Sequence, residues 1–162
     1  GSLPILLLKH LGYEIEIQAV IALVSIVGHN WSVYIKFRGG RGLATSIGIL
    51  LGLAMWVELL ALSILVIFFG RLFCKDTGPW SLIAFIVMPV ISILSHRPEA
   101  VSLLMLGMLL LVIFKRFTAN WETIPTENDS LYRILFNRLL WDRDANLKEN
   151  WISRKSKFQQ ED

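Results

Sequence analysis

Residues 37–46 read FRGGRGLATS, and this stretch lies at the junction of two long apolar runs, residues 17–34 and 43–57. It sets three glycines around two arginines, so a flexible backbone is combined with fixed positive charge. A polar, glycine-rich junction between two apolar runs predicts a loop between two helices. Its fixed positive charge favours an anion as the partner of that loop.

The composition of the whole chain indicates an integral membrane protein. Hydrophobic residues make up 54% of the 162 residues and charged residues only 18%. The mean hydropathy of +0.57 is high for a soluble domain of this length. Charge becomes dense only from Lys115 onward. We therefore expect a membrane domain over residues 1–116 and a cytoplasmic polar tail over residues 117–162.

The apolar runs predict an all-α, polytopic helix bundle. A crossing helix needs about 20 apolar residues, and lipid requires its backbone hydrogen bonds to be made internally. Counting a short first run, we expect about six membrane helices, several of them shorter than a full crossing. Their predicted ranges are 3–12, 17–34, 43–57, 59–73, 80–94 and 101–114.

Single residues within these runs predict how the helices pack. Gly48, Gly52 and Gly107 lack side chains and would allow neighbouring helices to approach closely. Pro89 would kink or break its helix because proline lacks the backbone N–H. Packing is the interpretation we favour for all four.

Lysine and arginine are unevenly distributed, which predicts the orientation in the membrane. If the loop at residues 36–41 is cytoplasmic, alternation places the basic residues near 71–75 and 115–116, and the tail, in the same compartment. Of the 16 Lys and Arg residues, only Lys9 and Arg97 fall on the opposite side. We interpret His96 and Arg97, in SHRPE (residues 95–99), as part of a polar turn there.

The chemistry of the loop predicts a phosphate site. Gly39, Gly40 and Gly42 would let backbone N–H groups converge at the start of the next helix, whose N-terminal end also favours an anion. Arg38 and Arg41 add forked donors suited to phosphate oxygens, and a hydroxyl could come from Thr45 or Ser46. Neither the Walker nor the dinucleotide-binding spacing is present. A plain basic loop with glycines for a tight turn remains the alternative.

Three other features of the sequence bear on function. His29 is a candidate because polar groups at membrane depth are often functional, but it could also simply bond a neighbouring helix. Cys74 is the single cysteine, which excludes an intrachain disulfide and a multi-cysteine metal site. The net charge of +3 gives no reason to expect nucleic-acid binding, since membrane topology accounts for it.

The run Gly28-His29, then FRGGRG at residues 37–42, then Ala44-Thr45 resembles a known motif. It is similar to the second signature motif of the bacterial acyl-phosphate:glycerol-3-phosphate acyltransferases, the PlsY type. That motif is roughly Gly-His, a spacer, then Phe-(Lys/Arg)-Gly-Gly-Lys-Gly-x-Ala-Thr. The resemblance covers about residues 1–120.

This resemblance implies a seven-helix enzyme of the bacterial cytoplasmic (inner) membrane that serves phospholipid biosynthesis. It would move a fatty acyl group from acyl phosphate to the 1-hydroxyl of sn-glycerol 3-phosphate, giving lysophosphatidic acid and phosphate. No metal or organic cofactor is implied. Arg41, at the family's lysine position, would be catalytic. The residues that would bind substrate phosphate are Arg38, Gly39, Gly40, Gly42 and Thr45.

The chain departs from the family pattern at two other motifs. The family's first helix and first motif would lie ahead of Gly1, so we expect either a fragment or a diverged relative. The third motif, about His-Arg-x-Asn, is matched imperfectly by KRFTAN at residues 115–120, with Lys115 in place of histidine. His29, Arg116 and Asn120 are therefore only candidates for supporting the site.

The tail predicts an amphipathic helix, with Leu131, Leu135, Leu139 and Leu140 near one face. It would begin at Asp129 or Ser130 and would either lie on the anionic leaflet or dock against the membrane domain. A transporter, or a non-catalytic subunit that binds a phosphorylated solute, is the alternative function. No feature of the sequence predicts whether the protein is a monomer or an oligomer.

Overall fold

The computed structural model describes residues 1–119 and 131–143, and every regular element within those two ranges is helical. The predicted all-α architecture is therefore confirmed. In chain order the elements are α1 (Ser2–His10), α2 (Ile15–Asn30), the 3-10 turn η1 (Val33–Ile35), α3 (Leu43–Gly52), α4 (Trp56–Ser63), the π-helical segment η2 (Ile64–Phe73), α5 (Thr77–Leu94), α6 (Glu99–Thr118) and α7 (Leu131–Trp141).

Helix lengths divide the predicted membrane segments into two groups. Among the described residues, four segments are long and apolar enough to cross a membrane: Ile15–Ile35, Trp56–Phe73, Thr77–Leu94 and Glu99–Thr118. The helices α1 and α3 have 9 and 10 residues, fewer than the roughly 20 of a crossing. The predicted run at 43–57 is interrupted because the chain turns at Ala54, which has a φ of 56°.

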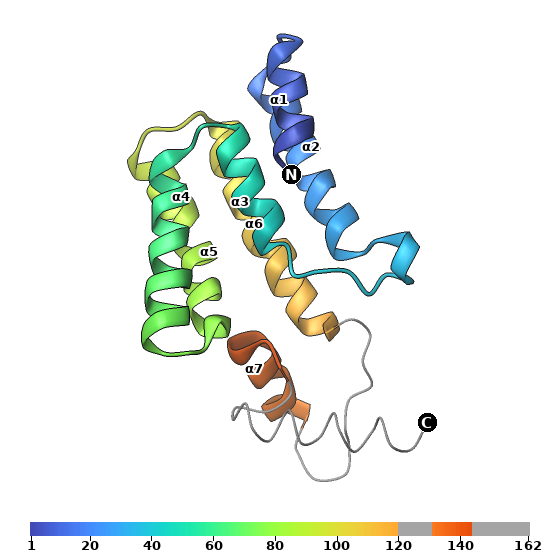
Figure 1. Ribbon diagram of the computed structural model, residues 1–162, viewed down its shortest axis with the longest axis vertical. Helices are drawn as coiled ribbons and strands as arrows, with labels where there is room; N and C mark the ends of the chain where they lie inside the picture. Colours follow the sequence, from blue (N-terminus) through green and yellow to red (C-terminus); the bar gives the residue numbers. More distant parts are fainter. Residues whose placement is uncertain (120–130, 144–162) are drawn as a thin grey trace.

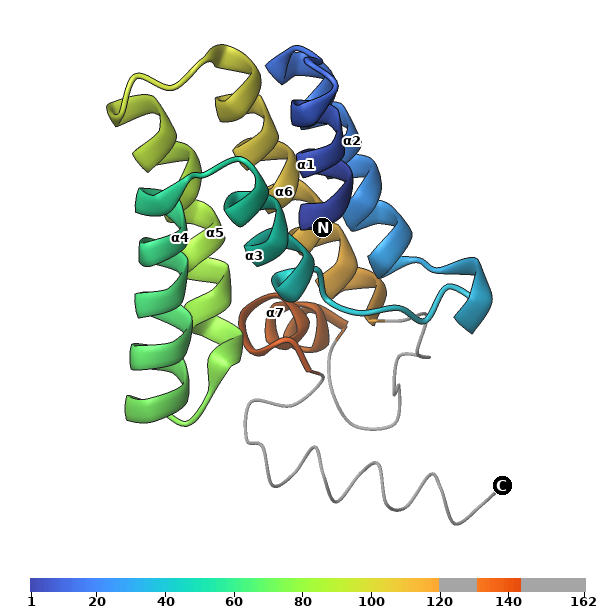
Figure 2. The same ribbon diagram turned by 45° about the horizontal axis from the view of Figure 1, so that its top comes forward.

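The connections between helices gather at the two ends of the bundle (Figure 1). The α1–α2, α3–α4 and α5–α6 turns lie at the upper end. The loop from α2 to α3, the turn from η2 to α5 and the end of α6 lie at the lower end, where α7 crosses beneath the bundle (Figures 1 and 2). The basic segments that the charge distribution assigned to one side of the membrane therefore share one end of the molecule.

Glycines lie where helices meet most closely, as the sequence predicted. A Cβ at Gly48 would lie 3.0 Å from Ser2 N, and one at Gly52 would lie 3.0 Å from Ile5 Cβ, so α1 and α3 pack tightly. A Cβ at Gly107 of α6 would lie 2.8 Å from a methyl carbon of Leu23 on α2. The predicted close approaches are confirmed. The helix α5 continues through Pro89 without the break that the proline could have caused.

Apolar side chains occupy both the inside and the outside of the bundle. The core contains fully buried side chains such as Phe85, Met88 and Met105. The outer faces expose many more than an ordinary soluble protein would. Examples on four of the long helical segments are Val20, Val24, Leu60, Ile67, Ile86, Val90, Leu103 and Leu110. This distribution fits a helix bundle whose outer surface contacts lipid.

The upper end contains an ion pair whose acidic partner is buried. Arg97, in the turn between α5 and α6, donates to both carboxylate oxygens of Glu58, at 3.0 and 3.2 Å. Glu58 lies in the first turn of α4 and is fully buried. The predicted polar turn is therefore present, and its arginine also joins two helices.

The helix α7 docks against α5 and α6, which is one of the two placements that the sequence left open. Of the leucines predicted near one face, Leu135, Leu139 and Leu140 are half-buried. Ile134, Asn137 and Arg138 are buried, whereas Leu131 is 59% exposed. Asp129 and Ser130, considered as starts of this helix, lie outside the described residues.

Candidate functional site

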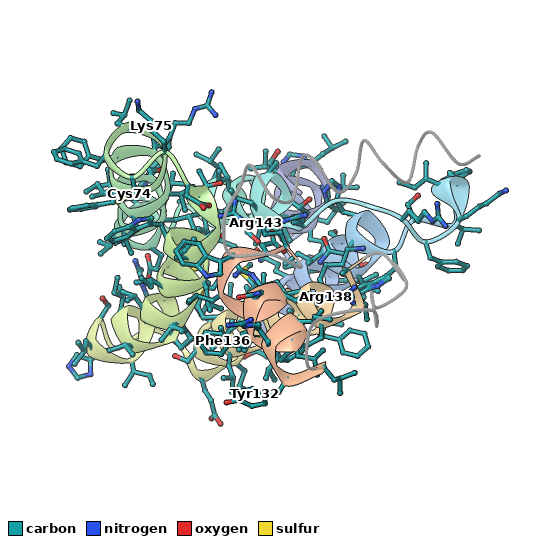
Figure 3. All side chains as sticks on the ribbon, turned by 90° about the horizontal axis from the view of Figure 1, so that it is seen from below. Cys74, Lys75, Tyr132, Phe136, Arg138 and Arg143 are labelled. Atoms are coloured by element: carbon teal, nitrogen blue, oxygen red, sulfur yellow. The ribbon has the colours of Figure 1, made fainter. Side chains whose placement is uncertain are left out.

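A cavity of about 220 Å³ opens at the lower end of the bundle, between α3, α5, α6 and α7. Figure 3 views this end directly, with Arg143 beside the end of α7 and Cys74 and Lys75 away at the η2–α5 turn. The cavity is lined by more positive than negative side chains. These charged lining residues are Arg41, Lys115, Arg116, Arg143, Asp76 and Asp142.

The glycine-rich loop reaches the cavity by folding back on the end of α2. The N–H of Gly40 donates to His29 O at 3.2 Å. Gly39 is buried, and a Cβ there would lie 2.6 Å from Asn30 O, a backbone atom that cannot move aside easily. Gly42 precedes α3 with a φ of 80°, a conformation that favours glycine. Glycine is thus required at position 39 by close contact and favoured at position 42 by backbone conformation.

Buried polar atoms beside this loop have no partner among the described residues. Both side-chain amide atoms of Asn30 are unpaired and the residue is fully buried. A Cβ at Gly42 would lie 3.1 Å from Asn30 Oδ1, so the amide sits beneath the start of α3. The buried Ser46 Oγ, in the first turn of α3, is also unpaired. Because buried polar groups are normally hydrogen bonded, these atoms indicate a polar ligand near the α3 N-terminus.

Lys115 and Arg116, near the end of α6, are both buried. Lys115 Nζ donates to the backbone oxygen of Asn30 and lies 5.0 Å from the centre of the Trp31 ring. Arg116 donates to Gly78 O at 2.7 Å and to Ser81 Oγ at 2.9 Å, and also to backbone oxygens of α7. Arg116 therefore connects α6 with both α5 and α7 while lining the cavity.

The remaining charged groups form two ion pairs that include the end of α7. Arg41 pairs with the Asp142 carboxylate, and its NH1 donates to the Asp142 backbone oxygen at 2.8 Å. Arg143 donates to Asp76 Oδ2 at 2.5 Å and lies over the Trp141 ring. The Arg41 side chain is 53% exposed, so it is the cation of this set that an incoming ligand meets first.

The structure brings together most of the residues that the sequence proposed. Arg41 and Arg116 line the cavity. The three loop glycines and the buried Thr45 lie in the loop and first turn of α3 next to it, and His29 contacts that loop. Arg38 is exposed in the same loop and does not line the cavity. Asn120 lies outside the described residues.

Sequence reasoning missed the contributions of Asp76, Gly78 and Ser81 at the start of α5 and of Asp142 and Arg143 after α7. The charge distribution predicted that both segments lie on the side of the glycine-rich loop, but it did not predict which charged side chains form ion pairs. Within the part of the chain that the structure describes, no group of three His, Cys, Asp or Glu side chains could hold a metal ion.

The fold and the cavity define a polytopic helical membrane protein with a cationic cavity at one end of its bundle. The family model described as glycerol-3-phosphate acyltransferase matches residues 1–126. The chain belongs to this glycerol-3-phosphate acyltransferase family.

Curated relatives carry the same description. Glycerol-3-phosphate acyltransferase 4 of Dehalococcoides mccartyi strain CBDB1 is 35% identical over 160 residues, with 95% of this chain and 67% of the relative aligned. Glycerol-3-phosphate acyltransferase 5 of another strain of that species is 33% identical, with 96% of this chain and 68% of the relative aligned. A Coxiella burnetii glycerol-3-phosphate acyltransferase is 30% identical, with 75% and 60% aligned. The chain thus spans about two thirds of the length of the first two relatives. No solved structure matches the chain.

Proposed function

We propose that the chain, in the cytoplasmic membrane of a bacterium, transfers a fatty acyl group from acyl phosphate to the 1-hydroxyl of glycerol 3-phosphate, and that the cavity binds substrate phosphate. The family supports the acyltransferase class. The observation that carries the site is the 220 Å³ cavity with four cationic side chains beside the glycine-rich loop. The products are lysophosphatidic acid and phosphate.

Substrate phosphate would bind between the exposed Arg41 guanidinium and the first turn of α3. The N–H groups of a first helical turn have no partners within the helix and favour an anion. Thr45 and Ser46 place hydroxyls in that turn. Gly39, Gly40 and Gly42 allow the backbone to come this close, although the Gly40 N–H is already engaged with His29 O. Arg38 adds positive charge at the approach to the cavity.

The reaction needs charge stabilisation more than a protein base. The glycerol hydroxyl attacks the carbonyl carbon of the acyl phosphate, negative charge develops on the carbonyl oxygen, and phosphate departs. Fixed cations beside the reacting atoms stabilise that charge, and holding two anionic substrates together contributes through proximity. A phosphate oxygen of the substrate can accept the hydroxyl proton. Arg41 is the group we propose to stabilise the transition state.

The proposal is tested by measuring lysophosphatidic acid, by mass spectrometry, and released phosphate from palmitoyl phosphate with and without glycerol 3-phosphate. The assay uses the 162-residue chain and, in parallel, the chain preceded by any residues that its gene encodes ahead of Gly1. We expect product that depends on both substrates. Product from the longer protein alone would mean that residues ahead of Gly1 complete the site. Binding of glycerol 3-phosphate without product in either protein would contradict the proposal and favour a transporter or a non-catalytic subunit.

Replacing Gly39 with alanine should lower the transfer rate on the order of 10²-fold, because a displacement of about 1 Å in a positioning element can cost that much. The new Cβ would collide with the backbone oxygens of His29 and Asn30, so the loop would have to move. Gly28→Ala is the matched control, since a Cβ at Gly28 meets nothing within 4 Å. Equal rates for the two variants would show that the position of the loop is unimportant.

A further inference from the structure

The end of α7 occupies the part of the cavity where the proposed substrate phosphate would bind. Asp142 bonds Arg41 through both its carboxylate and its backbone oxygen. Arg143, the next residue, is paired with Asp76 at the start of α5. The carboxylate of Asp142 thus takes the position on the Arg41 guanidinium that an anionic substrate would need.

A phosphate dianion and the Asp142 carboxylate compete for this guanidinium. Like charges a few ångströms apart repel each other, and a phosphate carries nearly two charges. An ion pair in which the Arg41 side chain is half exposed contributes little free energy to hold the carboxylate in place. Binding of phosphate therefore favours departure of the Asp142 carboxylate.

Polar contacts hold the end of α7 against the bundle, and an anion can compete for such contacts. The polar contacts of α7 with the rest of the protein include the two ion pairs, the bonds from Arg116 to the backbone oxygens of Leu139 and Leu140, and a bond from Arg138 to Phe117 O at 3.3 Å. Of the large apolar side chains on α7, Tyr132 and Phe136 point outward (Figure 3) and are 79% and 51% exposed. Ile134 is its one fully buried apolar side chain. Leu135, Leu139, Leu140 and Trp141 are half-buried, so the polar contacts at the end of α7, rather than the whole helix, are the part that an anion can open.

The helix α7 lies outside the part of the chain that the family model matches, which ends at residue 126. The alignments with the two Dehalococcoides mccartyi relatives cover 95% and 96% of the chain and so extend well beyond that residue. Asp142, which pairs with Arg41, is therefore supplied by a segment that the family model does not match but that the alignments with these two relatives include.

We propose that Asp142 is an internal competitor for phosphate: it neutralises Arg41 in the empty site, and an anionic substrate must displace it together with the end of α7. This inference rests on the proposed phosphate site but not on acyl transfer. Because linkage is reciprocal, phosphate must loosen α7 to the same extent that α7 docking weakens phosphate binding.

The first test measures binding of inorganic phosphate to the detergent-solubilised chain by calorimetry. Asp142→Asn should bind phosphate about fivefold more tightly than the parent protein, which corresponds to about 1 kcal/mol, the upper end of what an exposed ion pair contributes. In an Arg41→Ala background the same substitution should have a smaller effect, because only the repulsion between the Asp142 carboxylate and phosphate remains to be removed. Asp142→Glu, which keeps the charge, should resemble the parent.

The second measurement is hydrogen exchange of the backbone amides at residues 139–143, which should become faster when phosphate is added to the parent protein. Slower exchange would show that α7 closes on phosphate and would overturn the inference. So would equal or weaker phosphate binding by Asp142→Asn, or the absence of phosphate binding by every variant. Tighter binding by Asp142→Asn without any acyl transfer would leave this inference standing while the proposed function fails.

Discussion

Replacing Arg41 with alanine is expected to lower kcat/KM for acyl transfer to glycerol 3-phosphate by about 10²–10³-fold, the usual effect of losing one preorganised group that stabilises a developing oxyanion. Arg41 is the cation that an incoming ligand meets first, because about half of its side chain is exposed to solvent. The kinetics are measured in whichever form of the protein proves active. A fall in kcat with little change in KM would place the effect in the transition state rather than in substrate binding.

Two further variants separate the role of Arg41 from general effects of charge. Arg71→Ala removes an exposed arginine of η2 near the same end of the bundle without touching the cavity, so it should keep the parent rate. Arg41→Lys keeps the charge but not the forked donors and should fall between the parent and Arg41→Ala. Unchanged kinetics of Arg41→Ala would defeat the proposed role.

Arg41→Ala also leaves the Asp142 carboxylate without this partner, and that carboxylate alone would repel a phosphate. The double variant Arg41→Ala with Asp142→Asn removes the added repulsion. If the double variant recovers part of the lost activity, that part was due to the exposed acid. The remainder measures what the guanidinium itself contributes to the reaction.

The membrane class, the helical fold and the grouping of basic segments at one end could be predicted because each depends on local properties of the sequence. Apolar runs, glycines and the distribution of lysine and arginine are visible without tertiary structure. The turn at Ala54, by contrast, falls within an apolar run with no proline or glycine at that position. Hydropathy cannot distinguish such a run from one continuous helix, so the short α3 was predicted to be longer.

The candidate site was predictable in part for the same reason. The glycine-rich loop is contiguous in sequence, so its motif could be recognised. The pairs Arg41–Asp142 and Asp76–Arg143 each join residues more than sixty positions apart, and nothing in the sequence selects those partners. The sequence left open whether α7 docks against the bundle, because the bonds from Arg116 and Arg138 that hold it join separate segments of the chain.

At the opposite end of the bundle, Arg97→Ala should lower the free energy of unfolding by about 3–5 kcal/mol, the usual cost of leaving a buried charge without its partner. Arg97 makes two hydrogen bonds to the carboxylate of Glu58, which has no solvent exposure. Without Arg97 that carboxylate would remain buried with its charge uncompensated, or the turn between α5 and α6 would have to open to water. Thermal unfolding in detergent should show a fall in Tm of roughly 6–20 °C, at about 2–4 °C per kcal/mol for a chain of this size.

The double variant Glu58→Gln with Arg97→Ala decides whether the loss comes from the buried charge. A neutral amide costs far less to bury than a carboxylate, so the double variant should recover most of the lost Tm. Lys9→Ala, an exposed cation at the same end, should leave Tm unchanged. If the double variant were as unstable as Arg97→Ala, the arginine would instead be stabilising the turn through its own packing. In either case phosphate binding below Tm should persist, because this pair lies at the end of the bundle away from the cavity.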